Sequence, residues 1–95
     1  MKYNADVQKF AVEHGLLSYL ELAYKKVKEF YTNPMGLRTE FVIDPESDEE
    51  WLSVRFTTEG SLETIRAAHD KYRNFWVRNV PVDKRLKITL MYDIE

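Results

Sequence analysis

Two histidines, His14 and His69, are the only side chains in the sequence with an ordinary pKa near neutrality. Each borders the apolar stripe of an expected helix, which favours a half-buried packing role with one hydrogen bond. If they met across the two helices beside Glu13 or Asp70, they could work as an acid–base pair. A small-ligand pocket would then lie between helices and sheet, and its candidate residues are His14, His69, Tyr24 and Tyr72.

Acidic side chains alternate at Asp44, Glu46, Asp48 and Glu50, as they do at the start of a calcium-binding loop. The glycine that such a loop needs for its sharp turn is missing, because Glu49 follows Asp48. No glutamate stands at the position of the usual bidentate ligand. A solvated turn is the expected role, and we predict no metal, cofactor or catalytic residue.

The segment 66–87 combines basic side chains with Tyr72, Phe75 and Trp76, a mixture typical of nucleic-acid surfaces. Its aromatic residues lie on the apolar stripe of an expected helix, however, where they would be core. The whole chain also carries a net charge of −2, whereas dedicated nucleic-acid binders are basic. A nucleic-acid-associated regulator is therefore the alternative prediction, and its candidate basic patch is Arg66, Lys71, Arg73, Arg78, Lys84, Arg85 and Lys87.

A helix-turn-helix is a further alternative, because Ala11 and Gly15 stand four residues apart and Ser18 could cap a second helix. That second helix would begin Ser-Tyr-Leu-Glu-Leu-Ala-Tyr-Lys. It offers one lysine and no arginine, asparagine or glutamine to reach base edges. A long amphipathic helical segment is the better interpretation.

The elements that would position these residues follow from hydrophobic periodicity. Helical spacing extends over residues 4–32, with Asn4 as the expected N-cap. It also predicts a second helix, which begins after the N-cap Ser61 and ends at Val80-Pro81. A single helix over 4–32 would be roughly 43 Å long. We therefore expect either a break at Gly15 or one end that projects toward another chain. Strict alternation predicts strands at 37–43, 51–58 and 86–94.

The expected fold is a single α+β domain, residues 1–95, with element order α-β-β-α-β. Each strand is apolar on one face, so helices should cover one face of a three-stranded, mostly antiparallel sheet. The crossover through the second helix should run the third strand parallel to the second. Placing the third strand beside the first gives the predicted strand order 2-1-3.

Partner contacts are the expected function, because the uncovered sheet face would display a tryptophan. Charge is also polarised: residues 40–63 hold one basic and eight acidic groups, for −7, and residues 64–87 hold seven basic and two acidic groups, for +5. Such asymmetry can steer or orient association. We expect a non-enzymatic, homodimeric protein–protein interaction domain. The candidate interface residues are Val42, Trp51 and Met91 on the sheet and Leu20 on the first helical segment.

The remaining expectations concern the compartment. The 95 residues include no cysteine, which excludes disulfides and thiolate chemistry. Neither a signal-peptide-like apolar run nor a stretch of about 18 apolar residues is present. A cytoplasmic location without membrane contact is therefore expected.

Overall fold

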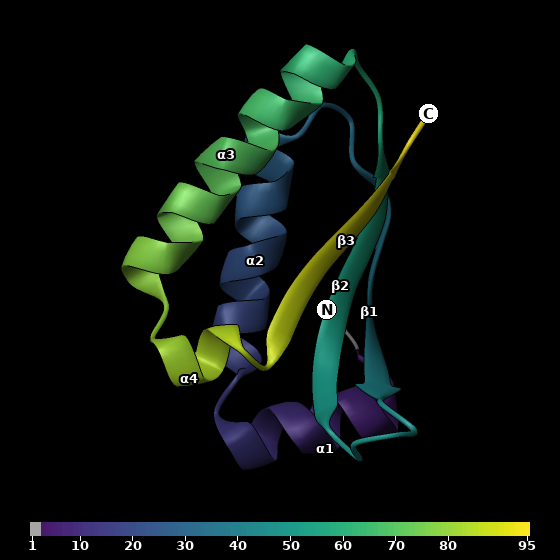
Figure 1. Cartoon of the computed structure of the whole chain (residues 1–95), viewed down its shortest axis with the longest axis vertical. Helices are drawn as coiled ribbons and strands as arrows, with labels where there is room; N and C mark the ends of the chain where they lie inside the picture. The colour runs from purple at the N-terminus through teal and green to yellow at the C-terminus, as the bar shows by residue number, and fades with distance from the viewer. Residues whose placement is uncertain (1–2) are drawn as a thin grey trace.

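The computed structural model describes residues 3–95 of the chain. The chain forms a three-stranded sheet. Figure 1 shows its helices gathered to one side and beneath it. The elements are α1 (Ala5–His14), α2 (Leu17–Phe30), β1 (Met35–Ile43), β2 (Glu50–Thr58), α3 (Leu62–Asn79), α4 (Val82–Arg85) and β3 (Ile88–Ile94). The α+β class is confirmed, but the order is α-α-β-β-α-α-β, so the predicted α-β-β-α-β order is wrong.

Gly15 divides the first helical segment into two helices. Its backbone adopts the left-handed conformation, with φ 65° and ψ 41°. The Leu16 N–H donates to the Ala11 carbonyl at 2.8 Å and the Gly15 N–H to that of Val12 at 3.3 Å, the paired bonds of a Schellman motif. The break lets α2 turn back along the sheet instead of projecting from it.

The strand order is β1-β2-β3, so the predicted order 2-1-3 is wrong. β1 and β2 pair antiparallel as a hairpin, and β3 pairs directly with β2 in the expected parallel direction. The sheet is therefore mixed, and the prediction of a mostly antiparallel sheet is wrong. β2 therefore occupies the centre, where Leu52, Ser53 and Val54 are all buried. Strands that are consecutive in the sequence are neighbours in the sheet in about two thirds of cases. The observed order follows this tendency, whereas the predicted order placed β3 beside β1.

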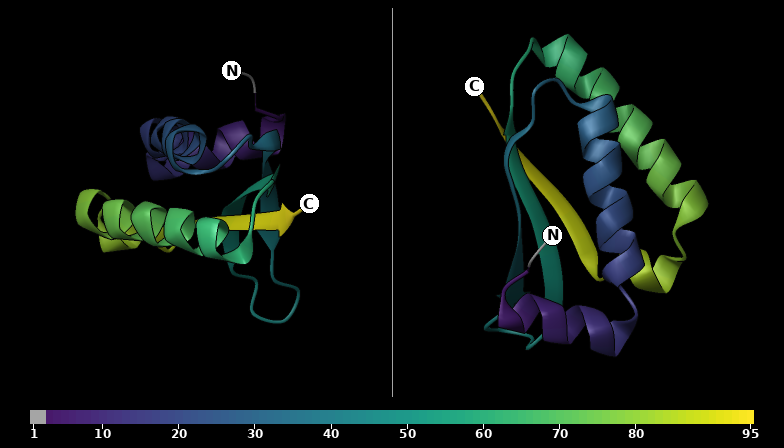
Figure 2. Two further views of the ribbon diagram at one scale, coloured as in Figure 1. Left: turned by 90° about the horizontal axis from the view of Figure 1, so that it is seen from above. Right: turned by 180° about the vertical axis from the view of Figure 1, so that it is seen from behind.

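The core lies between the helices and the inner face of the sheet. Val54 and Phe56 of β2 face buried residues of α2 and α3 such as Val27 and Tyr72. Seen end-on, the helices stay on one side of the strands (Figure 2, left). The prediction of helices on one face is confirmed, and no helix of residues 3–95 covers the opposite face. None of these helices combines the length and apolarity needed to cross a bilayer.

Candidate interaction surfaces

His14 and His69 have separate surroundings in the structure. The His14 ring lies 4.2 Å from the Phe10 ring at the C-terminal end of α1. His69 Nδ1 lies within hydrogen-bond distance of the Tyr31 hydroxyl, at 3.3 Å. α1 sits at one end of the sheet and α3 begins at the other (Figure 1), so the two histidines do not form a shared acid–base site.

The two candidate pocket tyrosines also serve the core. The Tyr24 hydroxyl shares a 2.7 Å hydrogen bond with Thr39 Oγ1, which ties α2 to β1. The Tyr72 ring stacks on Trp76 with ring centroids 5.5 Å apart. Burial raises the pKa of both phenols, and the hydrogen bond with Thr39 partly offsets this rise in the pKa of Tyr24. Both are therefore neutral packing residues at physiological pH.

The basic patch is not one surface. On α3, Arg66 and Arg73 lie seven residues apart and so share one side, while Lys71 and Arg78 share another. At 100° per residue these two rows stand about 140° apart around the helix axis. Asp70 lies 3.8 Å from Arg73 and offsets part of the charge of its row.

Two of the last three residues of the patch, Lys84 and Lys87, lie near α1. Lys84 Nζ donates to the His14 carbonyl at 2.6 Å, which caps the C-terminal end of α1. Lys87 Nζ lies 6.0 Å from the centroid of the Phe10 ring. The Arg85 Nε is buried without a hydrogen-bond partner. Lys84 and Lys87 therefore contact α1, and residues 66–87 do not form one continuous phosphate-binding stripe.

The aromatic residues of this segment are also engaged. Tyr72 and Trp76 are only 4% and 8% exposed. Phe75 is partly exposed, and the Lys26 ammonium lies 4.4 Å from its ring centroid. Stacking of bases on aromatic rings needs an open ring face. The helix therefore lacks a stacking platform for single-stranded nucleic acid.

The acidic segment forms the tip of the β1–β2 hairpin. Asp44 Oδ1 accepts a hydrogen bond from the Glu46 N–H at 2.9 Å, and this bond, together with contacts from Ser47, lowers the pKa of Asp44. The Asp48 N–H donates to the Asp44 carbonyl at 2.9 Å. This carboxylate closes a turn in the manner of an Asx motif. Within residues 3–95, no three potential metal ligands gather closely enough to hold an ion.

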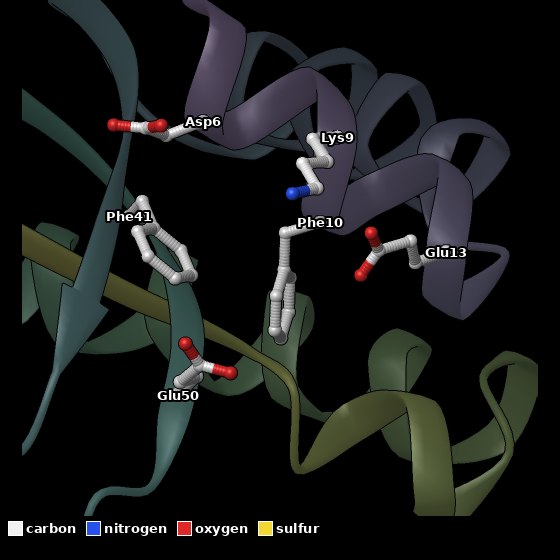
Figure 3. Close-up of a pocket in the computed structure, with 6 residues that line it drawn as sticks. All are labelled: Asp6, Lys9, Phe10, Glu13, Phe41 and Glu50. Atoms are coloured by element: carbon white, nitrogen blue, oxygen red, sulfur yellow. The ribbon is translucent and has the colours of Figure 1, made fainter.

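Sequence reasoning missed a shallow pocket of about 190 Å³ between α1 and the hairpin. Figure 3 shows the Phe10 and Phe41 rings with charged side chains around them. The two ring centroids are 5.3 Å apart. Its lining residues are Asp6, Lys9, Phe10, Glu13, Phe41 and Glu50.

The signal for this pocket was present in α1, where Asp6, Lys9, Phe10 and Glu13 follow helical spacing along one face. The β1–β2 register that adds Phe41 and Glu50 could not be read locally. Its lining includes no serine, cysteine or histidine. It is an acidic surface hollow with aromatic walls.

The outer face of the sheet matches the predicted interface most closely. It comprises Arg38, Glu40 and Val42 of β1, Trp51, Ser53, Arg55 and Thr57 of β2, and Thr89, Met91 and Asp93 of β3. Met91 is 49% exposed, and Val42 and Trp51 are partly exposed. These three candidate residues therefore share one uncovered surface. Leu20 does not, because it is fully buried on the inner side of α2.

Glu40 is the electrostatic centre of this outer face. Arg38 Nε donates to its Oε2 at 3.1 Å, and Arg55 Nε lies 3.3 Å from its Oε1 without hydrogen-bond alignment. Ser53, directly opposite Glu40 in the register, is fully buried and its hydroxyl has no hydrogen-bond partner. Two arginines thus share one carboxylate, which leaves the trio with one excess positive charge.

No family model, curated protein or solved structure matches the chain. Function therefore has to be inferred from the chain's own surfaces. The outer face combines apolar and charged side chains that no helix of residues 3–95 covers.

Proposed function

We propose that this protein is a non-enzymatic protein–protein interaction domain that self-associates through the outer face of its sheet. The single observation that supports this most strongly is the order of charges on that face. In the strand register, Arg38 and Arg55 lie side by side in one row, and Glu40 lies in the next row toward Trp51. A positive row followed by a negative row can complement itself.

Two copies would pack face to face, related by a two-fold axis that lies between them. This axis would run parallel to the two rows and midway between the Arg38 row and the Glu40 row, which makes the contact isologous. Each copy would then set Arg38 against Glu40 of the other copy, and Glu40 against the other Arg38. Trp51 would lie over Thr57 of the second copy and so would lose its remaining contact with water. Stacked sheets pack about 10 Å apart, which long arginine and glutamate side chains can span.

The size of the face sets the expected strength. Three strands about 4.8 Å apart and four rows about 6.8 Å apart make a surface of about 400 Å² per copy. Standard interfaces bury about 800 Å² per partner, whereas transient ones bury less. We therefore expect a reversible homodimer that forms at micromolar or higher concentrations.

Sedimentation velocity over a concentration series tests the proposal. The wild-type protein should shift from monomer to dimer, and Trp51→Ala should raise the dissociation constant about tenfold because large aromatics that become buried contribute most to such interfaces. Val77→Ala is the matched control, since Val77 is 52% exposed on α3 and outside the face. A wild-type protein that stays monomeric throughout, or a Val77→Ala variant that weakens the dimer as much, would contradict the proposal.

A further inference from the structure

A groove follows the free edge of β1, on the side of the sheet where α2 lies. Among residues 3–95, β1 is a terminal strand and pairs only with β2. A hollow of about 410 Å³ touches Leu37, Arg38, Thr39 and Glu40 of this strand, together with Tyr3 and Tyr24. Successive strand side chains point to opposite faces. A hollow that touches four consecutive residues therefore runs along the edge, beside the backbone.

The second wall of the groove comes from α2. A neighbouring hollow of about 300 Å³ is lined by Glu21, Lys25 and Lys28, and it shares Tyr3 and Tyr24 with the first. The three charged residues follow helical spacing, so they share one side of α2. The two tyrosine rings meet edge to face with centroids 6.0 Å apart and form the common floor. The buried Tyr3 hydroxyl in this floor has no hydrogen-bond partner within the described part of the chain.

An exposed strand edge presents unpaired N–H and C=O groups from every second residue. Over the four groove residues this amounts to about four hydrogen bonds for an added strand. Near the start of β1, the register shifts by one residue between Met35 and Arg38, where Gly36 has φ 64°. This bulge interrupts regular pairing as far as Leu37, so an added strand would align regularly with β1 from Arg38 onward.

The charges of the groove indicate the kind of strand that fits. Neither Lys25 nor Lys28 takes part in any of the ion pairs found among residues 3–95. The nearby Arg38 shares Glu40 with Arg55. Glu21 is the only acid of the α2 wall, which leaves that wall net positive. Complementarity therefore favours acidic side chains, with apolar ones toward the tyrosine floor.

We propose that this groove binds an extended, acidic segment of another protein by adding it as a strand to β1. Backbone hydrogen bonds would supply affinity, and the lysines and tyrosines would supply specificity, as in other strand-addition modes. This site shares Arg38 and Glu40 with the outer face. It does not depend on self-association, because its α2 wall and tyrosine floor lie on the opposite side of the sheet.

The probe for the test is an acetylated octapeptide of alternating valine and aspartate, titrated into isotope-labelled full-length protein and followed by amide chemical shifts. The expected shifts concentrate at residues 37–40 and on α2. A valine–lysine octapeptide, and the acidic octapeptide methylated on alternate backbone nitrogens, should each bind at least about tenfold more weakly.

Lys25→Glu with Lys28→Glu should weaken binding of the acidic octapeptide about tenfold or more. The matched control, Lys9→Glu with Lys71→Glu, makes the same change in net charge at exposed positions away from the groove and should bind within about twofold. The proposal is overturned by no binding at about 1 mM peptide, by equal binding of the methylated peptide, or by equal loss in the control variant. Shifts at 37–40 that appear when the protein alone is concentrated would instead assign the edge to a second copy.

Discussion

Replacing Gly15 with alanine tests whether the left-handed turn between α1 and α2 is required by the fold. Gly15 holds φ 65° and ψ 41°, and its N–H closes the C-terminal turn of α1. An alanine keeps that N–H but adds a Cβ in a backbone region that L-residues rarely adopt. The substitution therefore isolates backbone strain from the loss of any hydrogen bond.

Three contributions determine the size of the effect. Left-handed strain costs roughly 1–2 kcal/mol. Alanine also reduces the conformational freedom of the unfolded chain, which returns about 0.4–1 kcal/mol. Steric conflict adds little, because the nearest atom to the new Cβ is the mobile end of Lys84, with Nζ at 3.4 Å. Gly15→Ala should therefore destabilise the domain by about 1 kcal/mol, the strain remaining after that offset.

Urea unfolding followed by tryptophan fluorescence measures this change as a lower midpoint at unchanged slope. Gly15→Asn is the matched control and should lose less stability than Gly15→Ala, because asparagine tolerates the left-handed region better than alanine does. An alanine variant as stable as the wild type, or an asparagine variant less stable than alanine, would refute the reasoning.

Three further predictions concern contacts that the fold makes between distant segments. Lys84→Met removes the 2.6 Å hydrogen bond to the His14 carbonyl and should lower the free energy of unfolding, measured with urea, by about 1 kcal/mol. The control Lys71→Met changes an exposed lysine and should leave the free energy of unfolding nearly unchanged. Thr58→Val removes the 2.9 Å hydrogen bond from Thr58 Oγ1 to the Thr32 carbonyl and should lower the free energy of unfolding by about 1 kcal/mol. Thr58→Ser keeps the hydroxyl and should lower it less. Equal losses of stability in the two variants would count against a stabilising role of the bond. Burial raises the pKa of Tyr31, aided by Tyr92, and also that of Tyr72, aided by Tyr31. Because the folded state holds these protons longer than the unfolded chain does, the free energy of unfolding should fall as pH rises above about 10. Urea midpoints from about pH 8 to 11 should show this fall, and Tyr72→Phe should make it shallower; an unchanged slope in that variant would contradict the assignment.

Local signals in the sequence predicted the elements well. Asn4 and Ser61 were expected as N-caps, and their side chains accept hydrogen bonds from the Val7 and Thr64 N–H groups at 2.9 and 3.2 Å. α4 was missed because its four residues, Val82–Arg85, are too few to show helical periodicity after Pro81. Strand alternation correctly placed Val42, Trp51 and Met91 on one face, since alternation depends only on neighbouring residues.

Contacts between distant segments could not be predicted in the same way. The neighbour of β3 depends on how the chain returns after α3, which no local pattern encodes. Lys84 appeared in the sequence as part of a basic patch, but the fold brings it to His14, 70 positions away. Leu20 looked like a contact residue on an over-long helix, and the break at Gly15 turned α2 onto the sheet and buried it. The pocket beside Phe10 and the groove beside Tyr24 likewise arise only where separate elements meet.

The most direct test of self-association through the outer face uses two variants of opposite charge. Arg38→Glu places a second carboxylate against Glu40 of the other copy, and Glu40→Lys places an ammonium group against Arg38 of the other copy. Each variant alone should be monomeric in sedimentation velocity at concentrations where the wild type dimerises, with unchanged far-ultraviolet circular dichroism. In an equimolar mixture both contacts become attractive, so a heterodimer should form with an affinity close to that of the wild type. Two variants that dimerise alone, or a mixture of folded variants that stays monomeric, would contradict the proposed interface.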